Sequence, residues 1–111
     1  MRDDLVLLLE ILLASRKIAK FLEEKTKKQF LNDDMVQSAV ERQTEIMGEA
    51  SRLISKSFKN EHTEVSWRRP INLRNYYIHV YHLVKGEEVW RSAKTLVPLL
   101  EKTIAPLIPP E

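Results

Sequence analysis

Three side chains that could act together on a phosphodiester lie close to one another in the second half of the chain. Arg74, His79 and Tyr81 all fall in the segment RNYYIHVY at 74–81, in a chain with only three histidines and no cysteine. The guanidinium of arginine is a rigid cationic fork that matches phosphate, histidine exchanges protons near neutral pH, and tyrosine offers a hydroxyl donor or acceptor. The segment therefore predicts phosphodiester chemistry without a metal ion.

No metal site and no cofactor are expected. Histidine, aspartate and glutamate do not cluster with the spacing of metal ligands, and the absence of cysteine excludes zinc–thiolate sites, disulfides and a thiol nucleophile. RNA can be cleaved without a metal when its 2′-hydroxyl acts as nucleophile, which needs a base, an acid and a cation that holds the phosphate. His79 can be the base or the acid, and Arg74 can be the clamp.

The spacing of these residues limits how one chain can combine them. Arg74 and His79 are five residues apart and so about 140° apart around a straight helix, whereas Arg74 and Tyr81 nearly share a face. Either the helix is distorted near the motif, or Arg74 reaches into a cleft that a second copy also lines. Two copies that bring their His79 residues together across a two-fold axis would supply both an acid and a base.

Size and charge indicate one domain with a local basic site. The 111 residues fit a single domain, 1–111, and the net charge of +2 from 18 basic and 16 acidic residues is too balanced to indicate nucleic-acid binding by itself. Basic residues between 16 and 28 are most simply a solvated helix face. Arg68 and Arg69, just before Arg74, are the candidate RNA-binding pair.

Helix is the expected conformation throughout the first half of the chain. There are only two glycines, and apolar residues recur at intervals of three and four. A first helix is predicted from Asp3 or Asp4 to about Phe30. A second is predicted along the stripe from Val36 to Ile54, ending at 56–58, with a polar connection at 59–63.

The second half of the chain predicts two more helices. Pro70 suits the first turn of the third, and Gly86 is expected to end it. The last is expected to start at 87–88 and to kink or restart at Pro98, and later prolines predict an extended tail at about 105–111. The sum is an all-α fold, an antiparallel up-down bundle of four helices.

The apolar run from Leu5 to Ala14 is not expected to be a signal peptide or a membrane span. A bilayer span needs about 20 apolar residues, and this run is interrupted by Glu10 and followed by a charged stretch. The prediction is a cytoplasmic protein without membrane association.

The same run predicts self-association. Its apolar residues cover more than the single stripe that a helix of a small bundle can bury, which leaves one apolar face without a partner. A two-fold homodimer would cover that face. The apolar residues concerned are Leu5, Val6, Leu8, Leu9, Ile11, Leu12 and Leu13.

The chain resembles the HepT-like members of the HEPN superfamily of small helical proteins. The resemblance covers most of the chain and centres on Arg74, His79 and Tyr81, which match that family's Arg-x-x-x-x-His-x-Tyr signature. The supporting features are, in chain order, AVER at 39–42, IMGEA at 46–50, Trp67, and VKGEEVW at 84–90.

The resemblance implies a HEPN-like homodimer that acts as a metal-independent endoribonuclease. Such proteins are toxins of type II or type VII-like toxin–antitoxin pairs, and their antitoxin is a minimal nucleotidyltransferase of the MntA type. The antitoxin inactivates the toxin by transferring AMP to the motif tyrosine, which here would be Tyr81. The implied partners are therefore RNA, a second copy and the nucleotidyltransferase.

One residue of the second helix and one of the third are candidates for shaping the site. Glu49 could hydrogen-bond Arg74 or could be a plain solvated carboxylate, and Asn75 is a second candidate for support. Gly48 costs about 1 kcal/mol relative to alanine inside a helix. Close approach of another helix, or room for a cleft, would explain its presence.

Three classes of function remain open at this stage. The favoured one is a ribonuclease toxin. The second is a catalytically inactive subunit of the same fold that docks a nucleotidyltransferase, with His79 serving only structure. The third is a purely structural helical dimer. Incubating the protein with RNA and a chelator separates the first class from the other two.

Overall fold

The computed structural model describes residues 3–110, and within that range it contains helices and no β-strand. The all-α prediction is confirmed for these residues, and the ends of the predicted 1–111 domain, residues 1, 2 and 111, lie outside them. The four longest helices are α1 (Asp4–Leu22), α3 (Asp34–Leu53), α5 (Arg68–His79) and α6 (Gly86–Ile104). The shorter elements are α2 (Lys27–Leu31), α4 (Lys56–Glu61) and two 3-10 turns, η1 (Tyr81–Leu83) and η2 (Ala105–Leu107).

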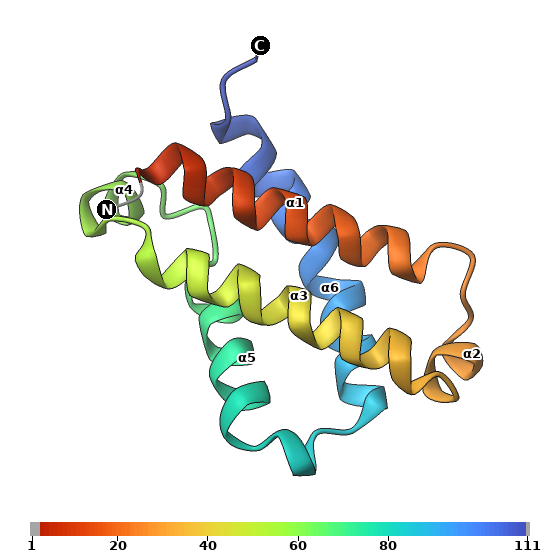
Figure 1. Cartoon of the computed structure of the whole chain (residues 1–111). Helices are drawn as coiled ribbons and strands as arrows, with labels where there is room; N and C mark the ends of the chain where they lie inside the picture. The colour runs from red at the N-terminus through yellow and green to blue at the C-terminus, as the bar shows by residue number, and fades with distance from the viewer. Residues whose placement is uncertain (1–2, 111) are drawn as a thin grey trace.

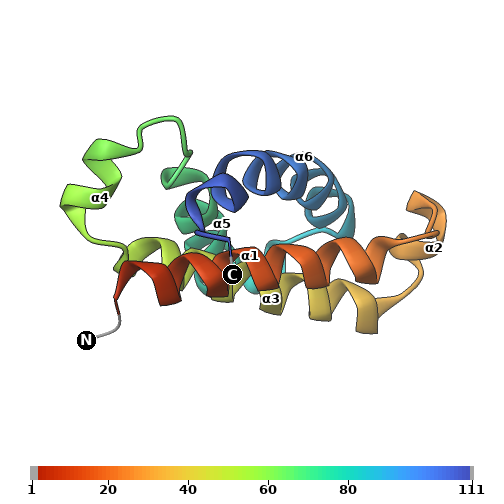
Figure 2. The same cartoon turned by 90° about the horizontal axis from the view of Figure 1, so that it is seen from above.

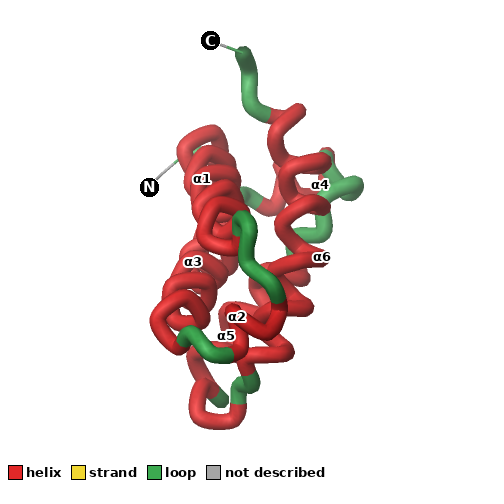
Figure 3. The backbone as a smooth tube through the Cα atoms, turned by 90° about the vertical axis from the view of Figure 1, so that its right-hand side faces the viewer, coloured by secondary structure: helices red, strands yellow, loops and turns green. Residues whose placement is uncertain are grey.

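The helices form two layers. Helices α1 and α3 lie side by side and run in opposite directions (Figure 1), and α5 and α6 both lie on the same side of that pair (Figure 2). The two layers are also visible in the side view of Figure 3. Helix α3 contacts both α1 and α5, and α1 contacts α6. Helix α3 is therefore the element against which the motif-bearing helix α5 is placed.

A single apolar core lies between the layers and supplies most of the stabilisation, since burial of apolar surface is the dominant favourable term in folding. All four long helices contribute to it, and Phe30 of α2 closes one end by packing on Trp90, with ring centroids 5.3 Å apart. The fully buried large side chains are Leu7, Leu8, Ile11, Ile18, Phe30, Val40, Met47, Pro70, Val89, Leu96, Leu100 and Ile104.

Helix α1 divides its apolar residues between the core and the surface. Its inner face is buried, whereas Leu5, Val6, Leu9 and Leu13 are exposed, Leu13 by 56%. The unpartnered apolar face expected from the sequence is therefore present. No helix within the described residues is long and apolar enough to cross a bilayer.

The predicted first helix was too long. It ends at Leu22 rather than near Phe30, and Glu24 adopts a positive φ of 61° that breaks the helical path. The chain restarts at α2 with a capping box, in which Thr26 Oγ1 accepts from the Gln29 backbone N–H and Gln29 Oε1 accepts from that of Thr26. This turn places the Phe30 side chain in the core.

The predicted end of the second helix and the polar connection after it were also wrong. Helix α3 stops at Leu53, and part of the expected connection forms α4, with Ser55 as its cap. Ser55 donates to the Asp4 carboxylate from its backbone nitrogen (2.8 Å) and its hydroxyl (2.6 Å). The chain leaves α3 at this point because Ser55 caps α4 and also hydrogen-bonds Asp4, the first residue of α1.

The third helix begins as predicted and ends earlier than predicted. Pro70 lies in the first turn of α5, but the helix stops at His79, and Gly86 is the first residue of α6 rather than a stop signal. A methyl group at position 86 would meet the side-chain amide of Gln37 at 2.9–3.0 Å. Gly86 is therefore placed for close approach to α3.

Pro98 does not restart the last helix, and the tail is not extended from residue 105. Helix α6 is continuous from Gly86 to Ile104, because Leu96 and Leu100 on either side of the proline are buried. Ala105–Leu107 then form η2, and extended backbone follows only at Ile108.

A buried tyrosine predicts how the fold responds to alkali. Burial, with a smaller contribution from the nearby carboxylates of Glu41 and Glu88, raises the pKa of Tyr77 from 10.0 to about 12, against the opposing effect of a hydrogen bond with Ser92. A raised pKa means that the neutral hydroxyl favours the folded state below the unfolded pKa, and that this contribution disappears as pH rises from about 10 to 12. The free energy of unfolding of the wild type should therefore fall relative to Tyr77→Phe over this range in urea titrations. If the free energies of unfolding of the two proteins changed in parallel with pH, the raised pKa of Tyr77 would be contradicted.

Candidate functional site

Arg74 lies where α5 packs directly on the backbone of α3. A methyl group at Gly48 would overlap the Cβ of Arg74 and would stand 2.5 Å from the backbone oxygen of Pro70. Glycine is thus required for the two helices to approach this closely, and it explains a residue that otherwise costs helix stability. The approach fixes the base of the Arg74 side chain.

The far end of Arg74 is held by polar neighbours. Its Nη1 donates to Asn75 Oδ1 at 2.9 Å, and its Nη2 is 3.3 Å from Glu49 Oε2. Glu49 also accepts from Nη2 of Arg52 at 2.6 Å, so one carboxylate lies between two guanidinium groups. Only 27% of the Arg74 side chain is exposed. These contacts orient the guanidinium and leave one edge accessible.

That edge faces a groove formed by three helices. The groove has a volume of about 460 Å³, and its charged lining contains three arginines and three glutamates, so it is balanced in charge. Ion pairs link Arg42 with Glu45 (3.5 Å) as well as Glu49 with its two arginines. The lining residues are Glu10, Arg42, Glu45, Ile46, Glu49, Ala50, Arg52, Arg74 and Ile78.

His79 does not join Arg74 in this groove. Helix α5 is regular from Arg74 to His79, its last residue, so these two side chains keep different directions. The helix ends before Tyr81, which lies in η1, so the expectation that Arg74 and Tyr81 share a helix face was wrong. His79 is exposed, and its neighbour Ile78 lines the groove instead. Within one chain, the structure brings together Arg74, Asn75 and Glu49, and leaves His79 apart from them.

Tyr81 is among the most accessible aromatic side chains of the described residues. It begins η1, is 71% exposed, and its ring meets that of His82 edge-on with centroids 5.5 Å apart. A molecule bound to another protein could therefore reach the Tyr81 hydroxyl without unfolding the chain.

The predicted RNA-binding pair lies outside the groove. Arg68 and Arg69 are both exposed at the start of α5, and Nη2 of Arg69 donates to Thr95 Oγ1 of α6 at 3.1 Å. Arg42 and Arg52 of α3, which sequence reasoning missed, do line the groove. Their signal was present, because 42, 45, 49 and 52 recur at three and four residues and share one helix face.

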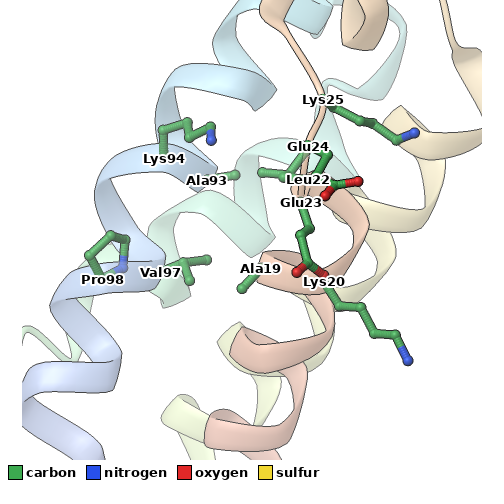
Figure 4. A pocket seen from close by; sticks show the side chains of 10 residues that line it. All are labelled: Ala19, Lys20, Leu22, Glu23, Glu24, Lys25, Ala93, Lys94, Val97 and Pro98. Atoms are coloured by element: carbon green, nitrogen blue, oxygen red, sulfur yellow. The ribbon is translucent and has the colours of Figure 1, made fainter.

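A second cavity, larger than the groove, contains none of the candidate residues. It measures about 670 Å³ and lies between the end of α1 and the middle of α6 (Figure 4). It combines small apolar side chains such as Ala93 and Val97 with lysines and glutamates at its rim. Size alone therefore does not locate the site. Within residues 3–110, no group of three or more His, Asp or Glu side chains could hold a metal ion.

Comparison with known proteins agrees with the motif. A family model described as "Ribonuclease HepT-like" matches residues 11–107. The chain is 33% identical over 103 residues to "Putative RNase MJ1380" of Methanocaldococcus jannaschii, which covers 93% of this chain and 94% of the relative. It is 38% identical over 84 residues to "Probable ribonuclease HepT" of Thermococcus cleftensis, which covers 76% of each. No solved structure matches closely enough to be compared. The chain belongs to the HepT-like ribonuclease family.

Proposed function

We propose that this protein is a metal-independent endoribonuclease and the toxin of a toxin–antitoxin pair of the type II or type VII-like kind. The observation that carries the proposal is the placement of Arg74. Gly48 and Glu49 hold Arg74 at a groove. His79, at the end of the same helix, is exposed to solvent, so the His79 of a second copy can approach it. Family membership supports ribonuclease activity.

The proposed reaction is an internal transfer at phosphorus. A histidine removes the proton of the RNA 2′-hydroxyl, whose oxygen attacks the adjacent phosphorus, and the bond from phosphorus to the 5′-oxygen breaks. A second histidine gives the leaving 5′-oxygen a proton, and Arg74 stabilises the charge that develops on the phosphate oxygens. The products are a 2′,3′-cyclic phosphate and a free 5′-hydroxyl. His79 of two copies would supply the acid and the base.

The exposed face of α1 supports the homodimer that this reaction requires. Leu5, Val6, Leu9 and Leu13 form a strip next to Glu10, which lines the Arg74 groove, so a dimer along this face would also bring its partner to the groove. Exposed apolar patches of this kind mark association surfaces.

Placing charges on this strip should separate the dimer. Because Leu9 and Leu13 are exposed, the double variant Leu9→Glu, Leu13→Glu should keep its helix content while the dimer dissociation constant rises at least about ten-fold. Sedimentation equilibrium would measure the change. Met35→Glu, at a residue of α3 that is 82% exposed, is the matched control and should remain dimeric. A wild-type monomer, or equal dissociation constants in all three proteins, would refute this interface.

The accessible Tyr81 supports control by a minimal nucleotidyltransferase antitoxin. In this proposal the Tyr81 hydroxyl attacks the α-phosphorus of ATP, pyrophosphate leaves, and AMP is attached beside His79. Intact-mass measurement after incubation with ATP and the enzyme would show one AMP-sized increment per chain. An increment that persists in Tyr81→Phe would refute this assignment.

The ribonuclease proposal is tested with purified protein, RNA and a chelator. Wild type should cleave RNA, and Arg74→Ala should lose most of that cleavage. Met35→Ala, at an exposed residue that does not line the groove, should cleave as wild type does. The absence of cleavage in all of these proteins would refute the proposal.

One observation favours a second candidate function. Because His79 does not line the Arg74 groove within one chain, the groove could instead serve as a docking surface of a catalytically inactive subunit for a nucleotidyltransferase. In that case Arg74→Ala would weaken binding of the nucleotidyltransferase, and neither wild type nor variant would cleave RNA.

A further inference from the structure

We propose that Tyr76 and Glu88 form a clasp that positions the segment 80–85, and with it His79 and Tyr81, for the chemistry described above. The inference rests on the proposed function for its catalytic meaning. Tyr76 and Glu88 are positioning residues here, because they act through their neighbours rather than on substrate.

The clasp joins both ends of the segment through one carboxylate. Tyr76 Oη donates to Glu88 Oε2 at 3.0 Å, and the Lys85 backbone N–H donates to Glu88 Oε1 at 3.3 Å. The first contact fixes the last turn of α5, and the second fixes the residue from which α6 starts. His79 and Tyr81 therefore lie inside a loop that is closed by side-chain hydrogen bonds.

Apart from Val84, which packs against the core, the segment has few other contacts. Its backbone bonds are local: Val80 N–H to Tyr76 O (2.9 Å), Leu83 N–H to Val80 O (2.8 Å) and Val84 N–H to Tyr81 O (3.3 Å). Tyr81 and Leu83 are 71% and 61% exposed, so packing contributes little at these positions. A short turn whose middle residues, 81–83, are exposed opens more easily than a core helix, which gives a polar clasp more influence here.

The protonation of the clasp suits its role. A tyrosine hydroxyl is already protonated at neutral pH, and the hydrogen bond to Glu88 raises the pKa of Tyr76 further above its ordinary value. Glu88 has two oxygens and uses one for each partner. Loss of either partner would free one end of the segment.

The chain provides a matched control in the adjacent residue. Glu87 has the same side chain on the same helix turn, but its Oε1 accepts from Lys27 Nζ at 2.7 Å and so joins α6 to α2 instead. Removing the carboxylate at 87 changes the charge in the same way and leaves both hydrogen bonds of Glu88 in place.

Hydrogen exchange tests the structural half of the inference without any ribonuclease activity. Backbone amides of Val80, Leu83, Val84 and Lys85 would be followed by NMR in wild type, Tyr76→Phe, Glu88→Ala, Glu88→Gln and Glu87→Ala. Loss of a hydrogen bond should speed exchange about five-fold in Tyr76→Phe and Glu88→Ala. Glu88→Gln retains an acceptor oxygen and should exchange more slowly than Glu88→Ala, whereas Glu87→Ala should match wild type. Equal exchange in all five proteins would overturn the clasp.

Cleavage kinetics test the positioning half. In Tyr76→Phe and Glu88→Ala, kcat for RNA should fall about ten-fold with KM nearly unchanged, because a displaced His79 impairs the reaction more than binding. Glu88→Gln should recover part of kcat, and Glu87→Ala all of it. Faster exchange with unchanged kcat would overturn the positioning role. If wild type does not cleave RNA, the proposed function fails, and the exchange experiment still decides whether the clasp exists.

Discussion

Replacing His79 by alanine is expected to lower the rate of RNA cleavage by about two to four orders of magnitude, the usual contribution of a general acid or base. His79 is exposed at the end of α5, so the substitution removes no core packing and the thermal midpoint should change little. Initial rates on a fluorescent RNA, with a chelator present, would measure the effect. His82→Ala, an exposed histidine on η1, is the control and should retain cleavage at near the wild-type rate.

A mixed dimer distinguishes one catalytic histidine from two. If each reaction needs His79 from both copies, equal amounts of wild type and His79→Ala refolded together should give about one quarter of the wild-type activity, since only random wild-type pairs are active. If each His79 acts alone at its own site, about one half should remain, and if either histidine suffices at a shared site, about three quarters should remain. Native mass spectrometry would verify that the copies have exchanged. A His79→Ala protein with wild-type cleavage would refute any catalytic role for this residue.

The regular parts of the fold could be predicted from the sequence because apolar periodicity carries that information directly. The start of α1, the stripe of α3 and the placement of Pro70 in the first turn of α5 all follow from local pattern. The exposed face of α1 was also predictable, because a small bundle can bury only part of so apolar a helix.

The predictions that failed concern places where a distant contact overrides local pattern. The capping box at Thr26 and Gln29 was visible in the sequence, but the turn it starts depends on the burial of Phe30 against Trp90. Gly86 was read as a helix stop, whereas its role depends on Gln37 of another helix. No single-helix pattern contains such information.

At the site, too, local pattern predicts some features and distant contacts determine the others. The angular separation of Arg74 and His79 on α5 could be predicted, and the candidate contacts of Arg74 with Glu49 and Asn75 are present. The rest of the groove could not be predicted, because periodicity does not say which helix faces which. The groove is completed by Arg42, Arg52 and Glu10 from α3 and α1. Gly48 and Glu49 indicated where the second helix would approach.

Gly48→Ala is expected to be the most damaging small substitution near the groove. The new methyl group would overlap Arg74 Cβ and stand 2.5 Å from the Pro70 oxygen, and neither atom can move without shifting α5. Overpacking of this kind costs up to about 3 kcal/mol, and the better helix propensity of alanine offsets about 1 kcal/mol, which leaves a net loss of about 2 kcal/mol. Because α5 carries Arg74, the shift should also lower cleavage about 100-fold. Urea unfolding and initial rates would measure the two effects.

Gly86→Ala is the matched control, because it adds the same methyl group at the only other glycine. There the methyl would meet the end of the Gln37 side chain, which can rotate away at the loss of its 2.9 Å hydrogen bond to the Phe30 oxygen. That loss is about 1 kcal/mol and should be largely cancelled by the gain in helix propensity. If Gly48→Ala proved as stable and as active as Gly86→Ala, α5 would not depend on close contact with α3. Another interaction, with Glu49 as the first candidate, would then have to hold Arg74 at the groove.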